Sequence, residues 1–200
     1  FNILFLLALP CTIGLYCLAP YIIKFIAGNE FLQATDSLKI LSFSIIFSIF
    51  SSFVTYVMLL PAKNEKIHLI ATFFSALENI ALNFMLIPVF KEKAAALTTL
   101  LAEASVFIIG YIGFNKKNKK IAKNLLKISS RNFLSGLIEC ICILILSSVI
   151  KLLQLNYIIK MFLIILFALL IYLLISIIVK NDLSIYIFKF LKNENKLKHK

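Results

Sequence analysis

Three glutamates lie inside long apolar stretches of this 200-residue chain: Glu78, Glu103 and Glu139. An ionised carboxylate at mid-membrane is costly unless it is paired, protonated or in contact with water. No lysine or arginine stands at comparable depth in these stretches, so we expect protonatable or water-accessible acids rather than buried ion pairs. Each of the three is therefore a candidate coupling acid of a transporter.

Polar side chains at helical spacing accompany two of these acids. Around Glu78 they fall on one arc, formed by Thr72, Ser75, Glu78, Asn79 and Asn83. In the preceding apolar stretch a narrow hydroxyl stripe follows Ser37, with the candidate residues Ser44, Ser48, Ser51 and Thr55. Such stripes either permit close helix packing through interhelical hydrogen bonds or line an aqueous cavity. Both explanations stay open here, and together with Glu103 these residues form the candidate substrate path.

The residues that follow Glu78 in the chain favour close helix crossing. Ala94, Thr98 and Ala102 recur at every fourth position, with Ala95 and Thr99 beside them. Overlapping sets of small residues at this spacing let two helix backbones approach closely in a membrane.

The elements that must position these residues are membrane helices. Crossing about 30 Å of hydrocarbon takes about 20 helical residues. Cutting the chain at its charged and proline-bearing breaks predicts six spans, at 1–25, 38–60, 67–87, 94–114, 133–150 and 158–179. We therefore expect an all-α, polytopic membrane helix bundle over 1–179.

Composition leads to the same class. Hydrophobic residues make up 62% of the chain and charged residues 15%, against roughly 45–50% and 25% in soluble domains. A water-facing surface cannot be assembled from so few polar residues. Four cysteines are also too few for a secreted disulfide scaffold.

The basic residues set the expected orientation. If the first span leaves the cytoplasm, 15 of the 21 lysines and arginines fall on inside segments. The remaining six are Lys24, Lys39, Lys91, Lys93, Lys151 and Lys160. Cytoplasmic loops carry the excess of positive charge, so we expect both chain ends in the cytoplasm. At the interfaces, Lys24, Lys39 and Arg131 are the basic residues that could meet an anionic ligand.

Two basic segments are expected to lie at the membrane surface. In 115–132, apolar Ile121, Leu125 and Ile128 oppose a lysine face, and the tail at 180–200 repeats that pattern. A helix of this kind lies among lipid headgroups and attracts anionic lipid. All but one of the basic residues are lysine, which argues against nucleic-acid recognition.

Enzyme chemistry finds little support in the sequence. The cysteines lack CxxC spacing, and His68 lies far along the chain from His199. Neither a phosphate-binding glycine loop nor a nucleophile elbow nor a zinc signature occurs. We expect neither catalysis nor a cofactor.

Three stretches resemble the C-terminal part of bacterial polysaccharide flippases, in the superfamily shared with multidrug and toxic compound extrusion transporters. The first holds Pro10, Gly14 and Pro20, followed by AGNEF at 27–31 and Ala34; the second is ENIALNFMLIP at 78–88; the third is AAALTTLLAE at 94–103. One departure is that Lys91, Glu92 and Lys93 stand where the family usually has glycines.

The resemblance implies a protein of about twice this length, with two helical lobes around a central cavity. This chain would be the C-terminal lobe, the last six of fourteen spans. The implied cargo is a polyprenyl-diphosphate-linked oligosaccharide, flipped from the inner to the outer leaflet by alternating access. The implied partners are that lipid-linked oligosaccharide, membrane lipid and the N-terminal lobe, in a bacterial inner membrane. A diphosphate needs cations, and this chain has few at membrane depth, so its candidate contacts are the interfacial Lys24, Lys39 and Arg131. We therefore expect the main diphosphate contacts on the N-terminal lobe.

Three other functions remain open. One is a cation-coupled multidrug exporter of the same superfamily, with Glu78 or Glu103 as the coupling acid. Another is a non-transporting membrane assembly protein, in which the polar stripes only hold helices together. A membrane-embedded sugar transferase is the third, although no paired external acids with a basic diphosphate site are visible.

Overall fold

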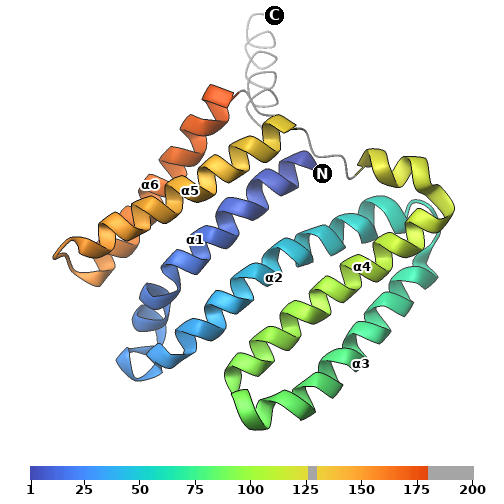
Figure 1. The fold of residues 1–200 in the computed structure, drawn as a ribbon, viewed down its shortest axis with the longest axis horizontal. Coiled ribbons are helices and arrows are strands. Elements are labelled where there is room, and N and C mark those ends of the chain that lie inside the picture. Colours follow the sequence, from blue (N-terminus) through green and yellow to red (C-terminus); the bar gives the residue numbers. More distant parts are fainter. Residues whose placement is uncertain (126–129, 180–200) are drawn as a thin grey trace, which may run out of the picture.

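The computed structural model describes residues 1–125 and 130–179 as six long helices joined by short connections (Figure 1). The helices are α1 (Asn2–Ala27), α2 (Thr35–Phe53), α3 (Glu65–Phe90), α4 (Glu92–Leu125), α5 (Ser130–Leu152) and α6 (Tyr157–Val179). A 3₁₀ segment, η1 (Asn29–Ala34), precedes α2, and a π-helical segment, η2 (Val54–Leu59), follows it. Within the described residues every regular element is helical.

Six of these units are long and apolar enough to cross a membrane, which confirms the predicted all-α polytopic bundle. Each predicted span lies along one of these units, and most bounds agree within a few residues, although α4 continues beyond the predicted end at 114 as far as Leu125. The second unit, Asn29–Leu59, begins nine residues before the predicted start at 38 and ends one residue before the predicted end at 60, because η1 and η2 continue α2 in both directions.

The helices form two groups that meet at α1 and α2. In one group α4 packs between α2 and α3, and in the other α1 packs against α5 and α6. α1 also packs along α2, so the two groups are continuous, with α3 and α6 at opposite ends of the arrangement (Figure 1). Each group carries its own set of buried polar side chains.

A buried apolar cluster joins α2 to α4. It consists of Phe53, Val54, Met58, Leu59 and Phe114, against which Phe1 and Ile67 also pack. Gly113 allows α3 to approach α4 here, because a Cβ atom at this position would lie 2.5 Å from Cγ2 of Ile67. By contrast, the outward faces of α3 and α6 expose many large apolar side chains, as expected of surfaces in contact with lipid or with another membrane helix.

Among the described residues, three that lie in turns have positive φ angles: Gly28, Lys63 (φ 54°) and Lys91. Gly28 has φ 87° between α1 and η1, a conformation that glycine adopts without a steric penalty. Lys91 has φ 52° between α3 and α4, where an L-residue with a side chain is strained. This is the turn in which the resembled family usually has glycines. Here Lys91 stands in their place but keeps a positive φ angle, which glycine favours.

The basic segment predicted at 115–132 begins as a continuation of α4. Helical geometry is interrupted at Asn118 (φ −134°, ψ 44°), and beyond it the chain turns away from the axis of α4 as far as Leu125 (Figure 1). The side chain of Arg131 and the tail at 180–200 lie outside the described residues, so the predictions for them are unchanged.

Candidate functional site

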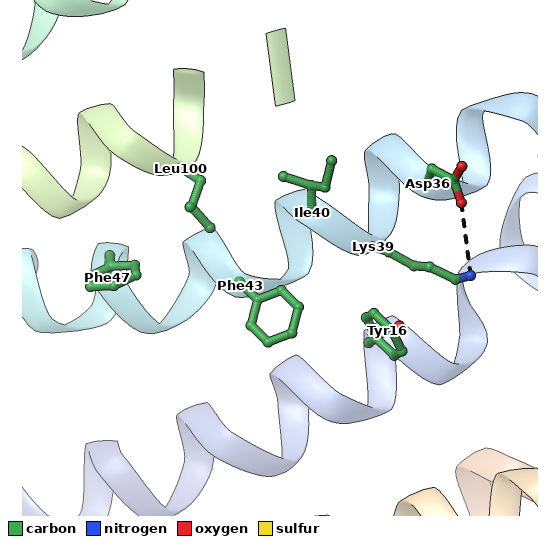
Figure 2. A pocket seen from close by; sticks show the side chains of 7 residues that line it. All are labelled: Tyr16, Asp36, Lys39, Ile40, Phe43, Phe47 and Leu100. Atoms are coloured by element: carbon green, nitrogen blue, oxygen red, sulfur yellow. Dashed lines mark ion pairs between the residues drawn. The ribbon is translucent and has the colours of Figure 1, made fainter. Parts of the chain in front are cut away.

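A cleft of about 530 Å³ opens between α1, α2 and α4 (Figure 2). We call it the Lys39 cleft; it is lined by Tyr16 from α1, by Asp36, Lys39, Ile40, Phe43 and Phe47 from α2, and by Leu100 from α4. The α2 residues recur at steps of three and four, so one face of that helix forms the floor. The cleft is an apolar, aromatic space with charge only at the start of α2.

Lys39 is the cation of this cleft, and it has two partners. Its Nζ lies 5.6 Å from the centroid of the Tyr16 ring and 4.0 Å from Oδ1 of Asp36 (Figure 2). Asp36 also binds Lys93, whose Nζ donates a hydrogen bond of 2.6 Å to Oδ2 of Asp36. Two lysines thus share one carboxylate, and Lys93 holds it more closely than Lys39 does. Since the Lys39 side chain is 34% exposed, this ammonium can still reach an anionic ligand.

The wall of the cleft is aromatic. The rings of Tyr16 and Phe43 meet edge to face with centroids 5.8 Å apart, which joins α1 to α2. Flat aromatic faces beside a partly exposed cation are suited to an amphiphile that carries a sugar and a phosphate. Tyr16 was not singled out in the sequence, because it is 23 positions from Lys39 and no local spacing connects them.

The polar arc of α3 faces α4 through direct hydrogen bonds. Ser105 Oγ donates to Oε2 of Glu78 at 2.6 Å, and Thr98 Oγ1 donates to Oδ1 of Asn83 at 2.7 Å. Asn83 Nδ2 in turn donates to Oδ1 of Asn79 at 2.6 Å. These contacts support the packing explanation for this arc, and none of its members is among the residues that line the Lys39 cleft.

Two further members of the α3 arc differ in their environment. Ser75 is buried and donates to the Ala102 carbonyl of α4 at 2.7 Å. Thr72, in contrast, is exposed on the outer side of α3. Ser105, which was not predicted as a site residue, lies seven positions after Thr98 on the same face of α4, and that spacing is the signal that could have found it.

The hydroxyl stripe of α2 also contacts neighbouring helices. Ser51 Oγ lies 3.5 Å from Oε2 of Glu103, at the limit of a hydrogen bond, and Thr55 Oγ1 lies 3.1 Å from Nδ1 of His68. Ser44 donates to its own helix at the Leu41 carbonyl at 2.7 Å. Ser48 is half-buried, with its carbonyl accepting from Ser51. Stripe residues thus contribute to the seam between α2, α3 and α4.

Glu139 does not join Glu78 and Glu103. It lies on α5 in the other helix group, where its side chain is fully buried. The three acids, predicted together as coupling candidates, are therefore divided between two different interfaces.

The basic candidates are also separated. Lys39 lines the cleft, whereas Lys24 Nζ lies 4.6 Å from the ring centroid of Tyr157, at the junction of α1 and α6. A cation over an aromatic ring is held there by the ring quadrupole.

An apolar groove of about 440 Å³ lies on the α6 side of α1, and we call it the α1–α6 groove. α1 contributes Pro10, Cys11 and Gly14, and the opposite wall includes Leu169 and Tyr172 of α6. Its surface is almost wholly apolar, which suits a hydrocarbon chain.

Comparison with protein-family models, with curated proteins and with solved structures finds no match to this chain.

Proposed function

We propose that this chain is the C-terminal lobe of a bacterial inner-membrane flippase that moves a polyprenyl-diphosphate-linked oligosaccharide from the inner to the outer leaflet. The three stretches that resemble polysaccharide flippases support this proposal. So do the two membrane-level spaces beside α1, one aromatic and cationic and the other apolar. Movement would come from rocking against an N-terminal lobe, with both ends of this chain in the cytoplasm.

The Lys39 cleft is the observation that carries the proposal. A lipid-linked oligosaccharide presents a sugar, a diphosphate and a hydrocarbon chain, and each needs a different surface. The rings of Tyr16 and Phe43 offer apolar faces to a sugar, while the Lys39 ammonium attracts a phosphate oxygen. Because Asp36 is hydrogen-bonded to Lys93 at 2.6 Å, it holds the Lys39 ammonium only loosely, at 4.0 Å. An anionic headgroup is therefore favoured over a cationic drug at this position.

The α1–α6 groove would accommodate part of the polyprenyl chain. Its apolar lining removes hydrocarbon surface from contact with polar groups but offers little to a sugar. The groove and the cleft both include residues of α1, namely Pro10 and Tyr16 respectively. A single amphiphile passing along α1 could thus meet an apolar surface and a cation in turn.

Removal of the Lys39 charge tests this proposal. In proteoliposomes of the full-length protein, we expect Lys39→Gln to slow flipping about fivefold, because one partly exposed charge contact contributes about 1 kcal/mol. Lys39→Arg should retain most of the rate. The matched control is Lys66→Gln, an exposed lysine of the predicted cytoplasmic loop. Equal rates for Lys39→Gln and Lys66→Gln would argue against a role for the cleft.

A non-transporting assembly protein is the second candidate, because of the hydrogen bonds between α3 and α4. Glu78 and Asn83 accept those bonds, and Asn79 accepts a bond from Asn83 within α3, so the polarity of all three has a purely structural explanation. Alanine replacement of the three separates the functions. If the triple variant flips at the normal rate but unfolds at a lower temperature, the three residues serve packing. If flipping is lost while protein levels stay normal, they line the path of the cargo.

A further inference from the structure

A second polar cluster lies where α1, α5 and α6 meet. We call it the Glu139 cluster; it consists of Glu139, Thr12 and Tyr172. Glu139 and Thr12 are fully buried, with relative exposures of 0%. Within the described part of the chain, both carboxyl oxygens of Glu139 and the hydroxyls of Thr12 and Tyr172 are buried and have no hydrogen-bond partner.

The register of the helices brings these residues to one level. α1 and α5 run in the same direction, since the rings of Phe5 and Phe133 stack at 6.2 Å and a Cβ atom at Gly136 would lie 2.8 Å from Leu9. One helical turn further along, Thr12 of α1 and Glu139 of α5 therefore lie at the same height in the bundle. From α6, Tyr172 is close enough for the charge of Glu139 to act on its hydroxyl. The three oxygen-bearing groups thus face a common junction.

The groups that face Glu139 cannot neutralise a carboxylate. Cys140 of α5 and Tyr172 of α6 are close enough to feel the charge of Glu139, and two thiols of α1 lie beside them, Cys17 near Cys140 and Cys11 near Tyr172. All four groups are neutral when protonated. The nearest basic residues along these three helices are Arg131, Lys24, Lys151 and Lys160. They stand eight to twelve positions from the cluster, which is roughly 12 to 18 Å along a helix. A buried carboxyl group without a counter-charge is accommodated in its neutral, protonated form.

α1 can change shape beside this cluster. Pro10 lies inside α1 and has no N–H to donate to the carbonyl of Leu6, so the helix is weakened two residues before Thr12. Pro10, Gly14 and Tyr172 also line the α1–α6 groove. Bending of α1 at this point would open the junction and bring water to the carboxyl group.

We propose that the Glu139 cluster is a proton-binding site, in which Glu139 holds a proton while α1, α5 and α6 are packed together and releases it to water when α1 bends away. The proton passes between a carboxyl oxygen and a water molecule, and no other bond changes. The ligand of this site is therefore a proton exchanged with water, and its binding and release would be coupled to the transport cycle. The role in coupling rests on the proposed flippase function, whereas the protonation can be measured separately.

Infrared spectroscopy of the full chain in lipid nanodiscs tests the protonation. In mildly acidic buffer we expect the wild type to show a carbonyl band of a protonated carboxylic acid that is absent from Glu139→Gln. This band should lose intensity in alkaline buffer, and Tyr172→Phe should move both its frequency and its titration midpoint. Glu78→Gln is the matched control, and it should leave the Glu139 band unchanged. If Glu139→Gln fails to fold, Glu139→Asp should retain a shifted band.

Two results would overturn the proton site. One is a spectrum in which Glu139→Gln removes only the bands of an ionised carboxylate at every pH. The other is loss of the protonated band when sodium is added at constant pH, because a metal ion would then occupy the site. A band that titrates in a protein without flipping activity supports the proton site and contradicts the proposed function, so the two failures are distinguishable.

Discussion

Ser105 Oγ on α4 lies 2.6 Å from Oε2 of Glu78 on α3 and donates a hydrogen bond to it. A hydroxyl and a carboxyl group from different helices thus satisfy each other inside an apolar span. The bond belongs to a row that includes Thr98 to Asn83 and Ser75 to the Ala102 carbonyl. Three polar side chains of α3 thereby hold α4 in register, and Asn79 supports one of them by accepting a bond from Asn83.

We expect Ser105→Ala to destabilise the bundle by about 1–3 kcal/mol, because it leaves the Glu78 carboxyl group without this donor. Thermal unfolding in detergent measures the change. Ser148→Ala is the matched control, since Ser148 is exposed and bonds only within α5, to the carbonyl of Leu144. Equal unfolding temperatures for the two variants would show that the bond contributes nothing to stability.

The contact between α3 and α4 also depends on Gly113, which has no side chain. We expect Gly113→Ala to cost about 1–3 kcal/mol, because the new Cβ would lie 2.5 Å from Cγ2 of Ile67 and must displace it. Gly14→Ala on α1 has no atom within 4 Å and should instead be stabilising by up to about 1 kcal/mol through helix propensity. Unfolding of both variants in one detergent gives the comparison. If both substitutions change the free energy of unfolding in the same direction, the packing described for α4 is contradicted.

Lys91 is expected to strain the turn between α3 and α4. Lys91→Gly should raise stability by about 1 kcal/mol, because glycine adopts φ 52° without a steric penalty. Lys91→Ala removes the same charge but keeps a Cβ atom, so it should leave the strain in place. If alanine stabilises as much as glycine does, the effect comes from the charge and not from the backbone.

The six helices were predictable because each depends on a local property, namely about 20 consecutive apolar residues between charged or proline-bearing breaks. The faces of the polar stripes were also predictable, since helical spacing alone fixes them. The spacing of residues along one helix does not determine which neighbouring helix a polar face contacts. It grouped Glu139 with Glu78, although the fold buries Glu139 against α1 and α6 and gives Glu78 a partner on α4. Nor could it pair Tyr16 with Lys39, a contact that exists only after α1 packs on α2.

The charge of the cleft should also govern which lipids it attracts. We expect binding of a lipid-linked oligosaccharide to weaken at high salt in the wild type, because Lys39 is partly exposed and its field is screened. Lys39→Gln should reduce this salt dependence by the share of one charge contact, whereas Lys160→Gln should keep it in full, since Lys160 donates to the carbonyl of Lys151. Binding to nanodiscs at two ionic strengths provides the measurement. An unchanged salt dependence in Lys39→Gln would place the phosphate contact elsewhere.

The most direct test asks whether the cargo touches the cleft. A photoreactive amino acid would replace Phe43, which lines the cleft, or Ile178, which is 75% exposed at the end of α6, in the full-length protein during transport. We predict adducts with the lipid-linked oligosaccharide at position 43 and adducts with bulk phospholipid alone at position 178. Phospholipid adducts alone at both positions would contradict the proposal that this lobe receives a lipid-linked sugar.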